Sequence, residues 1–181
     1  MNEMNYPSVT QLIQSLQVSS YGPPATEGNP YLLRGRKVHK SCALIARNLW
    51  SKPLPIEYQG YIASFKKWKD MMIKEVINSI EEEFIDEVYG FVGHPDLIAI
   101  LQDDSLCLLD LKTSASPWPG DRLQIAAYRA LVSQLYEVDK AGDVYLDKEG
   151  KMAKLVWCEK DANDFAIFLS LLNVYRFFAK E

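Results

Sequence analysis

Three charged side chains interrupt two otherwise apolar segments of the sequence. Asp96 comes directly before the apolar run 97–101, and Asp110 and Lys112 lie within the run 106–112. If the two runs are neighbouring antiparallel strands, both carboxylates meet near one end of a sheet, and period-two alternation sends Asp110 and Lys112 to one face. Such a face can bind Mg²⁺ or Mn²⁺ and place an ammonium beside the ion. A buried ion pair between Asp110 and Lys112 is the alternative, since lone buried charges are costly.

Charge is segregated along the chain. Residues 34–74 carry ten Lys and Arg against two acids, whereas residues 75–110 carry ten acids and no Lys or Arg, although the formal net charge is only −4. A basic surface next to an acidic pocket suits an enzyme that holds a polyanion over divalent cations. Charges solvated on unrelated faces are the alternative explanation.

We expect three helices in the N-terminal part of the chain. Residues 7–17 predict a short helix, and apolar residues spaced three and four apart predict helices over 36–50 and 58–73. Residues 20–30, rich in Gly and Pro, predict a loop between the first two helices.

Strand-forming segments follow these helices. Residues 75–87, 89–101 and 106–112 predict three strands with short connections, the second bent at Gly93-His94-Pro95. Three such strands form an antiparallel meander. Asp96 and Asp110 then lie on its second and third strands.

The rest of the chain predicts a helix over 121–136, short strands at 144–146 and 155–158, and a closing helix over 161–179. This order predicts an α/β or α+β fold, with the antiparallel meander inside a central mixed sheet flanked by helices. We expect one domain over residues 1–181. Its parts are a helical region with His39 (1–74), a catalytic sheet with the Gln124/Tyr128 helix (75–158) and a C-terminal helix (159–181).

Composition narrows the class of protein. A chain of 181 residues with 48% hydrophobic side chains can close a core and is not disordered. The three dispersed cysteines, Cys42, Cys107 and Cys158, favour a reducing compartment and cannot supply the four ligands of a zinc ribbon or an iron–sulfur cluster. The N-terminus lacks the layout of a signal peptide, and no segment is apolar enough to span a bilayer. We expect a cytoplasmic protein without membrane contact.

Several motifs, in order along the chain, resemble the PD-(D/E)XK nuclease superfamily. Gly93-His94-Pro95-Asp96 followed by Asp110-Leu111-Lys112 is similar to its bipartite signature, and Gln124-Ile125-Ala126-Ala127-Tyr128 is similar to the Q-x-x-x-Y helix of its RecB-like exonuclease branch. Upstream, Arg34-Gly35-Arg36-Lys37-Val38-His39 resembles the single-histidine helix of that branch, and Pro7-Ser8-Val9-Thr10 resembles the opening of many phage and prophage members. The resemblance covers residues 7–130 and implies a restriction-endonuclease-like core.

The resemblance also implies roles for the matching residues. Asp96 and Asp110 would hold one or two Mg²⁺ or Mn²⁺ ions, with His39 and the backbone carbonyl of Leu111 as further ligands. Lys112 would orient or activate the attacking water and stabilise charge on the phosphate.

Further residues would serve the substrate. Gln124 and Tyr128, on one helix face, would contact the substrate or brace the metal site. Arg34 and Arg36 would attract the DNA backbone without sequence preference. Glu83 is a further candidate acid, but three consecutive glutamates leave its alignment ambiguous.

Several of these residues have plain structural alternatives. His39 can be an ordinary surface residue, Tyr128 can belong to the core, and Gln124 can be an exposed helix position. Trp118, between two prolines, can either stack on a base or anchor its loop.

The resemblance implies a small metal-dependent DNA exonuclease without an iron–sulfur cluster. It would act on DNA ends in phage-type recombination or repair, alongside a recombination or single-strand-binding protein. An endonuclease of the same fold, such as a resolvase or restriction enzyme, is one alternative, which the Gln124/Tyr128 element disfavours. A non-catalytic DNA-binding accessory protein is another, which the intact Asp96, Asp110 and Lys112 disfavour.

Overall fold

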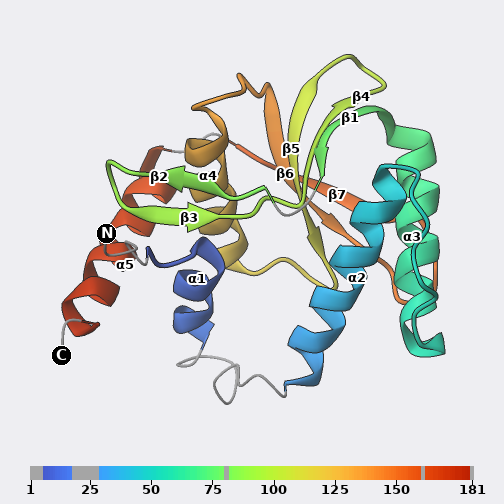
Figure 1. The fold of residues 1–181 in the computed structure, drawn as a ribbon, viewed down its shortest axis with the longest axis horizontal. Coiled ribbons are helices and arrows are strands. Elements are labelled where there is room, and N and C mark those ends of the chain that lie inside the picture. The colour runs from blue at the N-terminus through green and yellow to red at the C-terminus, as the bar shows by residue number, and fades with distance from the viewer. Residues whose placement is uncertain (1–5, 18–28, 80–81, 160–161, 180–181) are drawn as a thin grey trace.

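A five-stranded mixed sheet forms the centre of the molecule (Figure 1). The computed structural model describes residues 6–17, 29–79, 82–159 and 162–179. The sheet has the order β1-β4-β5-β6-β7, in which β5 and β6 are parallel and the other neighbours are antiparallel. Its strands are β1 (Ile73–Ser79), β4 (Leu97–Leu101), β5 (Leu106–Lys112), β6 (Lys140–Tyr145) and β7 (Lys154–Cys158).

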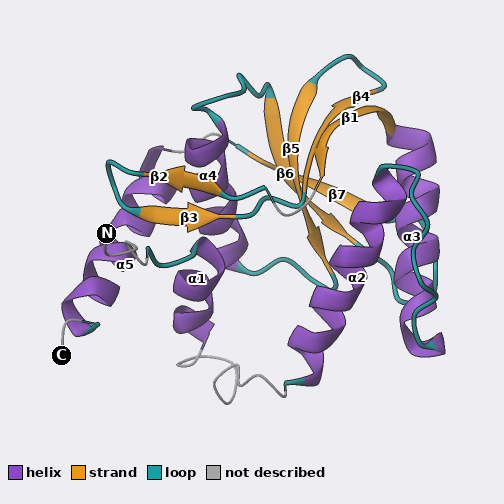
Figure 2. Ribbon diagram, viewed as in Figure 1, coloured by secondary structure: helices purple, strands orange, loops and turns teal. Residues whose placement is uncertain are grey.

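Helices cover both faces of this sheet (Figure 2). They are α1 (Val9–Gln17), α2 (Pro30–Ala46), α3 (Ile56–Met72), α4 (Pro119–Val132) and α5 (Ala162–Phe178). The predicted α+β class, with a mixed sheet flanked by helices, is confirmed. None of the described helices is long and apolar enough to cross a bilayer.

The predicted meander exists, but two of its strands are broken. Strands β1, β4 and β5 are antiparallel neighbours, whereas β2 (Phe84–Asp86) and β3 (Phe91–Gly93) leave the sheet as a separate hairpin. Pro95 has no backbone N–H and cannot continue a ladder, which separates β3 from β4. The prediction of continuous strands over 75–87 and 89–101 was therefore wrong.

Helix boundaries differ from the predicted ones where capping decides them. Helix α2 begins six residues earlier than predicted, because the Asn29 side chain accepts the Tyr31 N–H at 2.9 Å and Pro30 is suited to the first turn. Helix α4 begins at Pro119 and ends at Val132, whereas the prediction was 121–136. The predicted loop over 20–30 lies, except for its last two residues, outside the described parts of the chain.

Two hydrophobic cores lie on the two faces of the sheet. Alternation along β5 sends Leu108 into the core beneath α1, α4 and α5, and sends Leu109 and Leu111 into the core beneath α2 and α3. Asp110 and Lys112 have the same parity as Leu108. Their side chains therefore lie on the face that α4 covers.

We expect Gly60→Ala to destabilise the fold strongly. Gly60 lies in α3 against the turn that follows β6, and a Cβ there would lie 1.7 Å from the Lys148 carbonyl oxygen. Backbone would have to move, so we expect a loss of about 3 kcal/mol in the free energy of unfolding, measured by urea denaturation. Lys66→Ala, at an exposed position of the same helix, is the control and should stay within about 0.5 kcal/mol of wild type. Equal stability of both variants would contradict the close packing of α3 on this turn.

Candidate functional site

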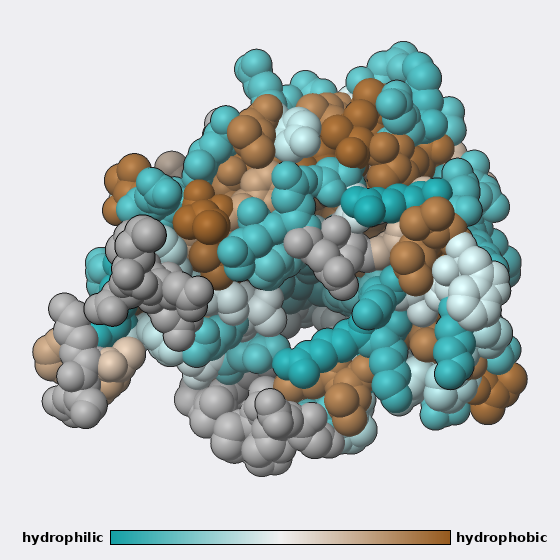
Figure 3. All heavy atoms as spheres, viewed as in Figure 1, coloured by the Kyte–Doolittle hydropathy of each residue, from teal (hydrophilic) through white to brown (hydrophobic). Residues whose placement is uncertain are grey.

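The predicted site residues surround a cleft at the end of β4 and β5. The cleft has a volume of about 1040 Å³, and every predicted site residue except Glu83 lines it. Helices α1 and α2 contribute residues to its walls. Figure 3 shows this face of the molecule hollowed between α1 and α2, with hydrophilic residues around the hollow.

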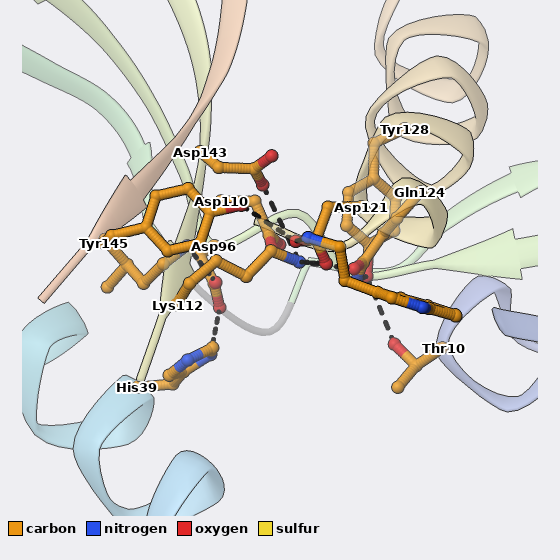
Figure 4. Close-up of polar contacts among 12 residues, drawn as sticks. Thr10, His39, Asp96, Asp110, Lys112, Asp121, Gln124, Tyr128, Asp143 and Tyr145 are labelled. Carbon is orange, nitrogen blue, oxygen red and sulfur yellow. Dashed lines mark hydrogen bonds and ion pairs between the residues drawn. The ribbon is translucent and has the colours of Figure 1, made fainter. Parts of the chain in front are cut away.

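Asp96 and Asp110 lie opposite each other at the end of the β4–β5 ladder. Leu97 pairs with Leu109, and continuing this register by one residue pairs Asp96 with Asp110. One oxygen of Asp96 lies 3.1 Å from His39 Nδ1, and the other accepts the Leu111 N–H at 2.8 Å (Figure 4). His39 is thus turned into the cleft toward Asp96.

Lys112 lies among three carboxylates. Its Nζ is 2.7 Å from Asp110 Oδ2, 3.4 Å from Asp121 Oδ1 and 3.6 Å from Asp143 Oδ1. The same nitrogen donates a 2.6 Å hydrogen bond to Gln124 Oε1. The predicted placement of Asp110 and Lys112 on one face is therefore confirmed by their contact, and the ion pair is part of a larger cluster.

Gln124 and Tyr128 connect Lys112 to α1. The Gln124 amide donates to the Tyr128 hydroxyl at 3.1 Å, and that hydroxyl lies 3.2 Å from the Thr10 hydroxyl (Figure 4). Tyr128 is also a core residue, only 2% exposed. Its ring packs in the core, which agrees with the structural alternative, while its hydroxyl lies at the cleft.

The remaining predicted residues lie at different depths. Arg34 is half-buried in the cleft wall, where its Nη2 donates to the Thr113 carbonyl at 3.2 Å. Arg36 is exposed on the cleft rim. Glu83 lies outside the cleft, with Oε2 3.6 Å from Nε2 of the cleft residue His94. Trp118 packs against the core, and its ring fills the space beside Gly120, which agrees with a loop anchor.

Burial and neighbouring charges shift the acids of the site in opposite directions. Burial raises the pKa of Asp96, but the charge of His39 and the hydrogen bonds from His39 and Leu111 together have the larger opposite effect. The pKa of Asp96 therefore lies below its usual value. Burial raises the pKa of Asp110 to about 6, although Lys112 opposes this effect. Asp96 is therefore ionised more readily than Asp110.

Acidic neighbours favour the charged forms of His39 and Lys112. Burial lowers the pKa of His39, but the charge of Asp96 and the hydrogen bond to it raise the pKa above its ordinary value overall. Burial also lowers the pKa of Lys112, but Asp110, Asp143 and Asp121 together raise it well above its ordinary value. Lys112 is an ammonium ion at neutral pH.

Sequence reasoning missed three residues of this cluster. Asp143 is 2% exposed and pairs in register with Asp110 across the parallel strands β5 and β6. Asp121, treated as a helix start, accepts the Tyr145 hydroxyl at 2.8 Å. The predicted strand at 144–146 began one residue too late to include Asp143. The alternation of Asp143 and Tyr145 with apolar residues, similar to that of Asp110 and Lys112, is the signal that could have revealed it.

The donor groups fit a hard divalent cation in type. In the described parts of the chain no three His, Cys, Asp or Glu side chains already converge as a metal site, and the two oxygens of Asp96 are engaged by His39 and the Leu111 N–H. However, Asp143 Oδ1 is buried without a hydrogen-bond partner among the described residues, and buried acids outnumber the cations beside them. Carboxylate and carbonyl oxygens with one imidazole are ligands that Mg²⁺ and Mn²⁺ accept.

Comparisons with known proteins do not assign the chain to a family. No protein-family model matches it, and no curated protein matches it either. A solved structure titled "Crystal structure of SSO0001" aligns at 15% sequence identity, covering 94% of this chain and 84% of that chain, with a TM-score of 0.43. A likeness this low carries no argument, so any functional proposal depends on the site itself.

We expect Asp143→Asn to stabilise the metal-free protein near pH 8. Burial raises the pKa of Asp143 to about 7 in the fold. An acid whose pKa is raised by folding destabilises the folded state as the pH rises from the pKa of the unfolded chain to the pKa in the fold. The advantage of the variant should be small near pH 4, grow to about pH 7 and then level off. Thermal unfolding in a chelator across this range measures it.

Asp103→Asn is the matched control for this experiment. Hydrogen bonds from Lys140 and Ser105 lower the pKa of Asp103, so its replacement should give no such gain at any pH. A stability difference between Asp143→Asn and wild type that does not vary with pH would contradict the raised pKa of Asp143.

Proposed function

We propose that this protein is a metal-dependent DNA exonuclease built on a restriction-endonuclease-like core. The observation that carries the proposal is the meeting of Asp96, Asp110 and Lys112 at one end of β4 and β5, beside His39 of α2 and Gln124 of α4. These residues belong to separate motifs that resemble those of PD-(D/E)XK nucleases. Their convergence in one cleft supports the resemblance.

Four groups of the chain would hold one or two Mg²⁺ or Mn²⁺ ions. They are the carboxylates of Asp96 and Asp110, the imidazole of His39 and the carbonyl of Leu111. A divalent cation bound there supplies positive charge that lowers the pKa of water and stabilises a phosphodiester as it gains negative charge. His39 and Asp96 already contact each other, so the two groups lie together where they would hold the cation.

Lys112 would act on the phosphate as a cation. Three carboxylates keep it protonated, so it can donate hydrogen bonds to a phosphate oxygen or to the attacking water but cannot accept a proton from that water. Donors placed in advance where negative charge develops lower the barrier to hydrolysis. Gln124 holds the ammonium toward the cleft through its 2.6 Å hydrogen bond.

Cations on the cleft rim would bind the DNA backbone. Arg36 and Lys40 are exposed and line the cleft from α2. Contacts of this kind are sensitive to salt and indifferent to sequence. They suit an enzyme that acts at DNA ends in phage-type recombination or repair.

Labelled DNA tests the proposed function directly. Linear single-stranded, linear double-stranded and covalently closed circular DNA are incubated with Mg²⁺, Mn²⁺ or EDTA. An exonuclease degrades the linear forms only in the presence of metal and leaves the circle intact. Cutting of the circle would instead identify an endonuclease, and binding without cleavage would identify an accessory protein.

We expect Asp110→Asn and Asp96→Asn each to lower the initial rate of cleavage by a factor of about 10³ or more while leaving the fold intact. Each removes a charged ligand oxygen with little change of volume. Asp70→Asn is the control, since its side chain is 75% exposed on α3, and it should cleave like wild type. Initial rates in Mg²⁺, with thermal unfolding as the folding check, measure both effects. Near-wild-type rates in either site variant would reject the site.

We expect His39→Ala to weaken Mn²⁺ binding about tenfold or more and to reduce cleavage in proportion. The imidazole would be lost from the ligand set while Asp96 keeps its hydrogen bond from Leu111. Titration calorimetry with Mn²⁺ measures the affinity, with Lys37→Ala, an exposed α2 position outside the cleft, as the control. Equal affinities in the two variants would exclude His39 from the ligand set.

A further inference from the structure

Tyr61, Arg34 and Tyr31 form a row of stacked side chains that extends from the interface between α2 and α3 to the cleft rim. The guanidinium carbon of Arg34 lies 5.4 Å from the centroid of the Tyr61 ring and 5.3 Å from that of the Tyr31 ring. Tyr61 is 6% exposed, whereas Tyr31 is 69% exposed and lines the cleft. The stack is therefore anchored in the interior and ends in an open aromatic ring.

Local hydrogen bonds hold this stack in place. Arg34 donates to the carbonyl of Thr113, the residue directly after Lys112. The backbone N–H of Tyr31 is held by the Asn29 side chain at the start of α2. Cation–π contacts to both rings fix the guanidinium between them. The Tyr31 ring thus lies against the Arg34 guanidinium with most of its surface open to solvent.

Gly35 leaves the helix surface open next to this stack. Gly35 lies inside α2 and lines the cleft, and among the described residues a Cβ there would meet only Thr113 Oγ1, at 3.9 Å. Glycine inside a helix costs about 1 kcal/mol relative to alanine, and no neighbour from the described parts of the chain requires it here. A ligand that approaches the α2 backbone would explain the missing side chain.

Among the described residues, no exposed aromatic side chain other than Tyr31 lines the cleft. Trp118 is packed against the core and Gly120, and Trp50, which is 79% exposed, does not line the cleft. Tyr31 lies two helical turns before His39, about 12 Å along α2. An unpaired base has a free π-face that can stack on a ring of this kind, whereas a base inside a duplex stacks on its neighbours.

We propose that Tyr31 is the stacking platform for a base of an unpaired DNA strand, whose backbone passes over Gly35 toward Lys112. The proposal rests on the proposed function and names its substrate class, which is single-stranded DNA or an unpaired end. Stacking of one base on an aromatic ring contributes about 1–3 kcal/mol.

Binding without metal tests the platform independently of cleavage. Oligo(dT) with 2-aminopurine at successive positions from each end is titrated with wild type, Tyr31→Phe and Tyr31→Leu in EDTA. Wild type and Tyr31→Phe should quench the fluorescence at one position. Tyr31→Leu should abolish that quenching and bind the oligonucleotide roughly tenfold or more weakly. All three should bind a blunt hairpin duplex equally.

Several results would overturn the platform. The first is that wild type fails to bind oligo(dT). The second is that the fluorescence quenching survives in Tyr31→Leu. The third is that Tyr31→Leu loses affinity equally for oligo(dT) and for the hairpin duplex. Absence of cleavage in metal together with intact stacking would reject the nuclease proposal alone. Cleavage without stacking would reject only the platform.

Gly35→Met tests the strand path. Methionine is a good helix former, so the variant should unfold at the same or a higher temperature while binding oligo(dT) several-fold more weakly. Gln59→Met, at an exposed α3 position outside the cleft, is the control and should keep wild-type affinity. Wild-type affinity in Gly35→Met would show that the strand does not pass over α2 at this point.

Discussion

The ammonium of Lys112 among buried carboxylates is the interaction on which the cleft depends. Its nitrogen lies within 3.6 Å of oxygens from Asp110, Asp121 and Asp143. Acids buried to this extent are strongly unfavourable without a cation beside them, and the loss of one partner of a buried pair leaves an uncompensated charge. Lys112 therefore has a structural task in addition to any role toward a substrate.

Strand topology assembles this cluster. Parallel strands need a crossover connection, and α4 is the crossover between β5 and β6. The parallel pairing places Asp143 beside Asp110, and the crossover helix brings Asp121 and Gln124 over the same strand ends. A hairpin between β5 and β6 would leave no helix at this position.

Helix α2 contributes basic side chains to the cleft, opposite the carboxylates of the sheet and α4. Its Arg36 and Lys40 lie exposed on the rim, and its His39 reaches down to Asp96. A polyanion bound at this rim lies above a floor of carboxylates, and cations held between them would reduce the repulsion at the floor. From the basic segment Arg34, Arg36 and Lys40 line the cleft, and from the acidic segment Asp96 and Asp110 do.

The sequence by itself determined the local part of this arrangement. Period-two alternation placed Asp110 and Lys112 on one face, and antiparallel pairing of two short-linked strands brought Asp96 opposite Asp110. Both follow from backbone geometry over a few residues. The helices on both sides of a mixed sheet were likewise predictable from hydrophobic periodicity and element order.

Only the tertiary structure decided the rest. Asp143 joins the cluster through its parallel register with Asp110. Local alternation can place Asp143 on a face of its strand, but the strand beside which it lies depends on how the crossover through α4 packs. The guanidinium of Arg34 lies over the ring of Tyr61, which belongs to another helix. The β2–β3 hairpin is separate from the main sheet, and Pro95 ends the ladder between β3 and β4. These contacts join residues far apart in the chain, so their geometry is set by the packing of the whole molecule.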